Sequence, residues 1–367
     1  MNRAAPLLAK RIAAPLFAAG ILTAVLPGVA SAQAPAAPAE PKLQAAPAAK
    51  PKLLRPKHTA PAPNAPPVPS NPTEGNAAPA TMNGKEPDLA FGAYQRGYYM
   101  TAFAFATKRI NENTDIKAMT LLGELYANGL GVPKDDAKAA EWYKFAADRG
   151  DREAMFALAM FRVTGRAGPR DREASAKWLA AAAKLGHSTA AYDLALLYME
   201  GELFPQDFGR AAELLHVAAN AGSPEAQYAL GTLYKEGRGV PKDMREAVRL
   251  WALAALSDNT DAQVEYAIAL FNGNGIDKNE PLAAAIFRKA ALKGSPIAQD
   301  RLAHILAAGR GATANPVEAA KWHIISKARG ETDIVLDDFV SKLDADQRAK
   351  AENAAKPWLE ALKPPRS

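Results

Sequence analysis

One stretch, AMTLLGELYANGLGVPKD at residues 118–135, contains the pattern from which the fold can be predicted. Its first glycine after the apolar run, Gly129, recurs every 36 residues without any insertion or deletion, at Gly165, Gly201, Gly237, Gly273 and Gly309. A fixed period of this length is typical of proteins built from stacked structural repeats. The repeat therefore indicates a protein that functions through the surface it presents to a partner more than through an active site.

Several other positions follow the same period. An alanine precedes each glycine, at Ala118, Ala154, Ala190, Ala226, Ala262 and Ala298. A large apolar residue stands four positions after each alanine, at Leu122, Leu158, Leu194, Leu230, Tyr266 and Leu302. An acid or its amide follows each glycine, at Asp135, Asp171, Asp207, Asp243, Asn279 and Asn315. These sets predict one common unit repeated six times.

Each unit is predicted to consist of two helices. Ala118, Leu122 and Tyr126 are four residues apart, so they form one apolar stripe on a first helix. Gly129 follows that stripe, where a left-handed residue can end the helix without steric cost. Asp135 then precedes the second helix as its N-cap, since a short acidic side chain can accept hydrogen bonds from free backbone N–H groups.

The second helix has its own stripe. In the first unit it comprises Ala139, Trp142 and Ala146. Small residues at its edges let the two helices approach closely. The bulky position recurs at Trp142, Trp178, Leu214, Leu250, Ile286 and Trp322, which we expect to fill the space between helices.

This pattern resembles the Sel1-like repeat family, a relative of the tetratricopeptide repeats. The resemblance covers residues 118–332 as six repeats, while residues 88–117 are similar to a shortened, degenerate first repeat. Local departures are Arg162 in place of the stripe tyrosine and Leu203 in place of a second loop glycine. The resemblance implies an all-α fold, a right-handed superhelical solenoid of antiparallel helix pairs whose concave face, lined by the first helices, binds other proteins. It implies no enzymatic activity and no cofactor.

The N-terminus has the pattern of a secretory signal peptide, residues 1–32. Arg3, Lys10 and Arg11 precede the apolar run 12–26, and small residues end the segment at Ala32, the predicted cleavage site. The run is shorter than the roughly 20 residues that a spanning helix needs, although an uncleaved anchor is the alternative. We therefore expect export to the periplasm of a Gram-negative bacterium and no stable membrane insertion after cleavage.

Residues 33–87 are rich in proline and alanine and lack the large apolar residues of a core, so they predict a disordered tail. The tail is interpreted as a solvated spacer, with weak contact to the cell wall as the alternative. Residues 1–87 contain nine basic and three acidic groups, which accounts for the whole formal net charge of +6. The repeats are therefore neutral overall, and no basic patch points to nucleic acid. The absence of cysteine excludes disulfides and a lipidated cysteine.

Residues 333–367 lie beyond the repeats and are predicted to form capping helices, because the last repeat of a solenoid would otherwise expose an apolar face. Asp344 is the expected N-cap of the final helix, which carries Trp358. A docking helix for a partner is the alternative.

No catalytic, cofactor or metal-binding motif is recognisable. Neither a His-Glu-x-x-His nor a Gly-x-Ser-x-Gly sequence occurs, and the five histidines do not pair at metal-ligand spacing. Ser223 and Ser295 follow the glycines that end repeats, where a serine is expected to cap the next helix. A cell-wall hydrolase or lytic enzyme on a helical-repeat scaffold remains the alternative, and it predicts one buried acid in a cleft, out of register with the repeats.

The candidate partner-binding groove follows from helix geometry. At about 100° per residue, offsets of three, six and ten residues from each alanine lie opposite the apolar stripe. These offsets select mostly acidic or neutral polar side chains: Glu124, Asn128, Asp193, Glu200, Thr232, Glu236, Glu265, Asn272, Arg301 and His304. We expect an acidic-leaning groove that binds an extended segment or a helix, with an ordinary solvated helix face as the alternative.

Together these features predict a non-catalytic periplasmic scaffold or regulator with a protein partner in the cell envelope. A sensor kinase, a polysaccharide-assembly protein or a peptidoglycan enzyme are partner classes that the resemblance allows.

Overall fold

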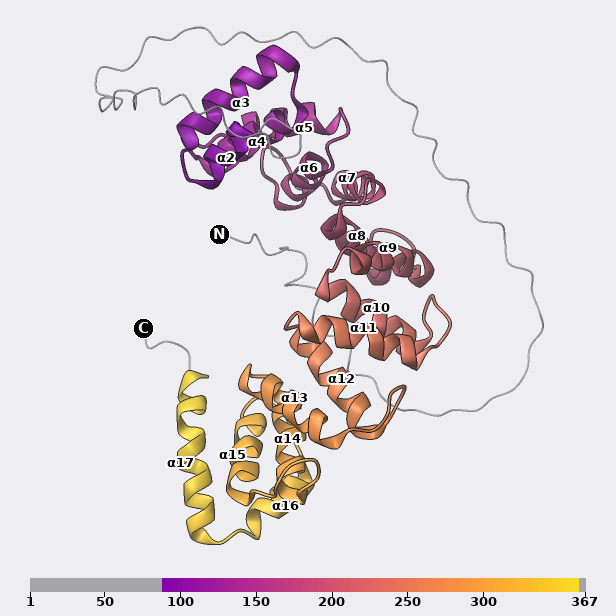
Figure 1. Ribbon diagram of the computed structural model, residues 1–367, viewed down its shortest axis with the longest axis vertical. Coiled ribbons are helices and arrows are strands. Elements are labelled where there is room, and N and C mark those ends of the chain that lie inside the picture. Colours follow the sequence, from indigo (N-terminus) through magenta and orange to yellow (C-terminus); the bar gives the residue numbers. More distant parts are fainter. Residues whose placement is uncertain (1–87, 363–367) are drawn as a thin grey trace, which may run out of the picture. The chain divides into compact units, whose positions relative to one another are not determined.

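A computed structural model describes residues 88–362, and the regular structure of this segment is entirely helical (Figure 1). The predicted signal peptide and tail, residues 1–87, and the last five residues, 363–367, lie outside the described residues.

Six helix pairs make up most of the described segment. The first helices of the pairs are α4 (Ile116–Asn128), α6 (Arg152–Thr164), α8 (Ser188–Glu200), α10 (Pro224–Glu236), α12 (Thr260–Asn272) and α14 (Pro296–Ala308). The second helices are α5 (Asp136–Ala147), α7 (Arg172–Lys184), α9 (Phe208–Asn220), α11 (Met244–Leu256), α13 (Glu280–Leu292) and α15 (Pro316–Lys327). Each first helix packs on its own second helix, which in turn packs on the next first helix. This succession of antiparallel pairs is a helical solenoid.

The local signals read from the sequence are confirmed. All six periodic glycines end first helices in the left-handed conformation, as at Gly129 with φ 67°. All six periodic Asp or Asn residues are N-caps of second helices, as Asp135 shows by accepting a 3.0 Å hydrogen bond from the backbone N–H of Lys138. Ser223 and Ser295 cap α10 and α14.

In four of the six repeats the buried residue of the second-helix stripe is one position after the predicted one, whereas the predicted Leu250 and Trp322 are buried as expected. Tyr143 is buried, whereas Trp142 is only half-buried at the edge of the core. The residues that face the first helix of the same repeat are therefore Tyr143, Leu179, Leu215, Trp251, Phe287 and His323. One residue corresponds to about 100° of rotation around a helix, so this difference changes which side chain fills the core.

The size of the buried residue on each second helix is matched by the size of the residue that faces it on the first helix. A Cβ added at Gly123 would lie 2.6 Å from the Tyr143 ring, and one at Gly231 would lie 2.7 Å from the Trp251 ring. Where the partner is a leucine, the first helix carries alanine instead, as Ala159 does opposite Leu179 in the second repeat. Interiors packed at close to crystal density require such compensation between facing positions.

The two ends of the described segment complete the stack. At the start, α2 (Leu89–Gln95) and α3 (Tyr99–Asn113) form a further helix pair, and α3 packs on α4. At the other end, α16 (Ile334–Ser341) contacts α14 and α15, and α17 (Ala345–Ala361) lies along α15. The Trp358 ring meets Trp322 edge-on with centroids 5.2 Å apart. Asp344 caps α17, as expected, by accepting a 2.7 Å hydrogen bond from the backbone N–H of Gln347.

Candidate functional site

The acidic residues predicted to line the groove are largely engaged within the fold. Glu124 accepts hydrogen bonds from Asn128 (2.7 Å) and from the hydroxyl of Tyr143 (2.8 Å). Three further carboxylates form ion pairs: Glu200 with Arg172 (3.0 Å), Glu236 with Arg238 (3.3 Å) and Glu265 with Lys235 (2.9 Å). Thr232 turns its hydroxyl back onto the carbonyl of Tyr228. The negative charges of Glu200, Glu236 and Glu265 are therefore offset locally, although exposed pairs of this kind contribute little to stability.

Asp193 does not lie in the groove, and its prediction as a partner-binding residue is wrong. Its side chain is completely buried in α8, and neither carboxylate oxygen has a hydrogen-bond partner among the described residues. Burial raises the pKa of Asp193 to about 7. The equivalent position is Ala157 in the preceding repeat and Ala229 in the following one. Helix periodicity alone therefore misplaces Asp193, because the fold encloses its side chain whereas Ala157 and Ala229 are only half-buried.

Three of the predicted residues meet at one pocket in the last two repeats. Asn272, Arg301 and His304 lie on the rim and walls of a pocket of about 380 Å³. The first helices α12 and α14 provide most of the lining, with contributions from α13 and from the loop after α14. The remaining lining residues are Ile268, Phe271, Phe287, Ile305, Ala308 and Arg310. Glu124, Asn128, Glu200, Thr232 and Glu236 lie on earlier repeats and do not belong to this pocket.

The pocket combines apolar walls with cationic groups. Arg310 is held in place by an ion pair with Glu280 and lies over the Phe271 ring, 4.7 Å from its centroid. Arg301 is exposed and forms no ion pair within residues 88–362. The lining contains no carboxylate. The pocket lining therefore contains basic but no acidic side chains, unlike the acidic-leaning groove that the sequence suggested, and Glu280 offsets the charge of Arg310. Such a pocket suits a ligand that presents a large apolar group beside an anionic group.

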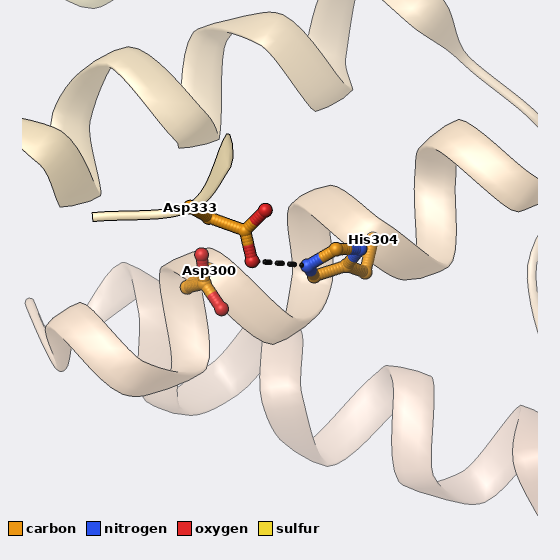
Figure 2. A group of neighbouring side chains, drawn as sticks. All are labelled: Asp300, His304 and Asp333. Carbon is orange, nitrogen blue, oxygen red and sulfur yellow. Dashed lines mark hydrogen bonds and ion pairs between the residues drawn. The ribbon is translucent and has the colours of Figure 1, made fainter. Parts of the chain in front are cut away.

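His304 also belongs to a second group of polar side chains, which Figure 2 shows together with Asp300 and Asp333. The Nε2 atom of His304 lies 2.8 Å from Oδ2 of Asp333, whose Oδ1 caps α16 through the backbone N–H of Leu336. Asp300 stands one helical turn before His304 on α14. One potential ligand atom from each of the three residues lies within 4.8 Å of the others.

The pKa values of the Asp300 and Asp333 carboxyl groups are shifted in opposite directions. Burial raises the pKa of Asp300, whose Oδ1 atom is buried without a hydrogen-bond partner among the described residues. Burial would also raise the pKa of Asp333, but hydrogen bonds from the backbone N–H of Leu336 and from His304 lower it below its usual range. The two acids are thus held in opposite electrostatic environments a few ångströms apart.

This group was not found from the sequence, although one signal was present. Asp300 and His304 are four residues apart on a predicted helix, and such residues lie on the same face. The third member could not be placed, because Asp333 follows the repeats. A seventh unit would place its first-helix cap 36 residues after Ser295, at Glu331, whereas α16 is capped by Asp333.

The fold defines a tandem helical-repeat protein. The Sel1 repeat model matches residues 116–151, 152–187, 188–223, 224–259, 260–295 and 296–330. The chain therefore belongs to the Sel1 repeat family, as the sequence resemblance suggested. Proteins of this family are generally non-catalytic scaffolds for protein–protein interaction.

Solved structures agree on the fold. A Sel1 repeat protein from Oxalobacter formigenes is 28% identical, and the alignment covers 65% of this chain and 98% of that one with a TM-score of 0.54. The protein c5321, a protective antigen of uropathogenic Escherichia coli that displays an SLR fold, is 24% identical over 76% of this chain and 71% of its own, with a TM-score of 0.53. No curated protein matches the sequence.

None of the helices between residues 88 and 362 combines the length and apolar character needed to cross a membrane.

Proposed function

We propose that this protein is an exported, non-catalytic scaffold that binds a segment of a partner protein, and that the pocket between α12 and α14 receives that segment. The family supports binding of proteins in general. The exported location rests on the signal-like residues 1–32, and an envelope protein as partner follows from that location.

The observation that carries the proposal is the composition of the pocket. Four large apolar side chains form its walls, while Arg301 has no carboxylate partner among the described residues. A peptide that places an aromatic or aliphatic side chain between the walls and a carboxylate against Arg301 would satisfy both features. Charge-assisted hydrogen bonds between arginine and carboxylate are among the stronger polar contacts.

The hydrolase alternative receives no comparable support from this pocket. It predicted an acid in a cleft, but the pocket lining contains no carboxylate, hydroxyl or thiol group. Among residues 88–362, the one buried acid that departs from the repeat pattern is Asp193, which is fully enclosed and cannot contact a substrate. The His304–Asp333 pair thus has no nucleophile beside it in the lining to activate.

Site-specific photo-crosslinking in cells tests this proposal. A photoreactive amino acid replaces Ala308, which is exposed and lines the pocket. In the control the same photoreactive amino acid replaces Ala285, which is exposed on α13 outside the pocket lining. We expect a discrete crosslinked partner only at Ala308. Replacing Arg301 by glutamine should then lower its yield at least about tenfold, since the loss of a hydrogen bond to a charged group costs about 1.5–3 kcal/mol.

Two results would contradict the proposal. One is the same crosslinked products at both positions, and the other is an Ala308 product that Arg301→Gln leaves unchanged. Charge reversal at Glu200 and Glu236 tests the acidic groove separately, because these residues lie on earlier repeats. Loss of the partner on those reversals alone would assign binding to the acidic face instead.

A further inference from the structure

We propose that Asp300, His304 and Asp333 bind a divalent ion of the zinc type, which links the last repeat to the helices that follow it. This inference does not depend on the partner proposed for the pocket. It rests on the convergence of three ligand-bearing side chains from two parts of the chain, α14 and the residue that caps α16 (Figure 2).

The geometry is close to that of a metal site. Ligand atoms on a tetrahedral zinc ion lie about 3.4 Å from one another, given metal–ligand bonds of about 2.0–2.2 Å. Here the three candidate atoms lie within 4.8 Å of one another, and Nε2 of His304 is 2.8 Å from Oδ2 of Asp333. Small side-chain rotations would therefore bring them onto one ion, with a fourth position left for water.

A second observation concerns Asp300 itself. Its Oδ1 atom is buried and has no hydrogen-bond partner in the described segment, an arrangement that is costly for a polar atom. The nearby Asp333 adds a like charge. A cation between the two carboxylates would remove the repulsion and supply the missing partner, which the hydrogen bond between His304 and Asp333 does not do.

The donor set selects the kind of ion. One imidazole with two carboxylates suits zinc, because magnesium and calcium favour ligand sets made entirely of oxygen. Asp333 is already oriented by its hydrogen bond to the backbone N–H of Leu336, which fixes its free oxygen toward His304. Hydrogen bonds of this kind orient metal ligands in proteins.

The chain contains a matched control. His323 on α15 pairs with Asp337 on α16 at 2.7 Å, which repeats the histidine–aspartate contact without a third ligand in the described residues. Asp337→Asn alters that pair and leaves the proposed site intact. Asp300→Asn removes one proposed ligand while keeping the shape of a side chain whose Oδ1 atom has no hydrogen-bond partner in the described segment.

The test is isothermal titration of the chelator-treated full-length protein with zinc chloride at pH 7.5, with calcium and magnesium chloride as parallel titrants. We expect one zinc ion per chain for the natural protein and for Asp337→Asn, and a higher Tm with zinc present. Asp300→Asn and His304→Gln should weaken this binding at least about a hundredfold, the upper end of what the loss of an outer-shell contact costs. Affinity should fall on acidification, since zinc binds unprotonated imidazole.

Circular dichroism of each variant confirms that it is folded. The proposal is overturned if no stoichiometric zinc binding occurs, or if Asp300→Asn binds zinc as the natural protein does. Stoichiometric calcium or magnesium binding that the same substitutions abolish, in place of zinc, would overturn the assignment of the ion.

Discussion

Replacing Gly123 by alanine tests the size compensation between the two helices of a repeat. Alanine in a helix interior is normally more stable than glycine by about 1 kcal/mol. At Gly123, however, the new methyl would lie 2.6 Å from both Cδ1 and Cε1 of Tyr143, while carbon atoms in contact prefer about 3.5–4.0 Å. The ring cannot easily move, because it is buried, its hydroxyl is bonded to Glu124 and Phe161 packs edge-on at 5.5 Å.

The expected magnitude follows from these opposing effects. Overpacking by one methyl group in a rigid core costs about 2–3 kcal/mol, from which the helix preference recovers about 1 kcal/mol. Gly123→Ala should therefore lower the free energy of unfolding by about 1–2 kcal/mol. The control is Gly92→Ala in α2, where the nearest atom would be 3.6 Å away at the end of the Arg96 side chain. That substitution should leave stability unchanged or raise it.

The assay is urea unfolding followed by circular dichroism, applied to a double-mutant cycle. Gly123→Ala with Tyr143→Leu reproduces the alanine–leucine pair that the second repeat has at Ala159 and Leu179. In the Tyr143→Leu background the same alanine should stabilise the protein by about 1 kcal/mol, which gives a coupling energy of about 2–3 kcal/mol. The reasoning is refuted if Gly123→Ala has the same effect in both backgrounds, or if it stabilises the natural protein.

Two further predictions concern stability. Burial raises the pKa of Asp193 to about 7, so its carboxyl group stays protonated in the folded chain at pH values where the unfolded chain has already lost that proton, above about pH 4. The free energy of unfolding therefore falls as the pH rises from about 4 to 7. Asp193→Ala, which introduces the residue of the adjacent repeats, should therefore raise the free energy of unfolding more at pH 8 than at pH 4, by up to about 4 kcal/mol, with a correspondingly larger rise in Tm. An equal gain at both pH values would exclude burial of a charged carboxylate. Gly239→Ala should lower the Tm far more than Gly222→Ala. Both glycines have positive φ, but only at Gly239 would a Cβ meet the Phe208 backbone, at 2.1 Å, so similar losses would count against this contact between repeats.

Much of the fold could be predicted because its signals are local. An N-cap such as Asp135 acts on a backbone N–H three residues ahead, and Gly129 ends a helix through its own φ. These interactions repeat with the sequence, so the period alone located six helix pairs and their turns. The one-residue difference between Trp142 and Tyr143 shows the limit, since both are large and only the packing of the facing helix decides which is buried.

The sequence by itself thus determined the repeat, its caps and the face on which Asn272, Arg301 and His304 lie. Only the tertiary structure decided that these three line one pocket, that Asp193 is enclosed, and that Asp333 meets His304. The physical reason is that each of these outcomes depends on contacts between neighbouring repeats or with α16, where the 36-residue register ends. A periodic sequence specifies the geometry within each unit, but the surroundings of a side chain that departs from the period depend on the units packed against it.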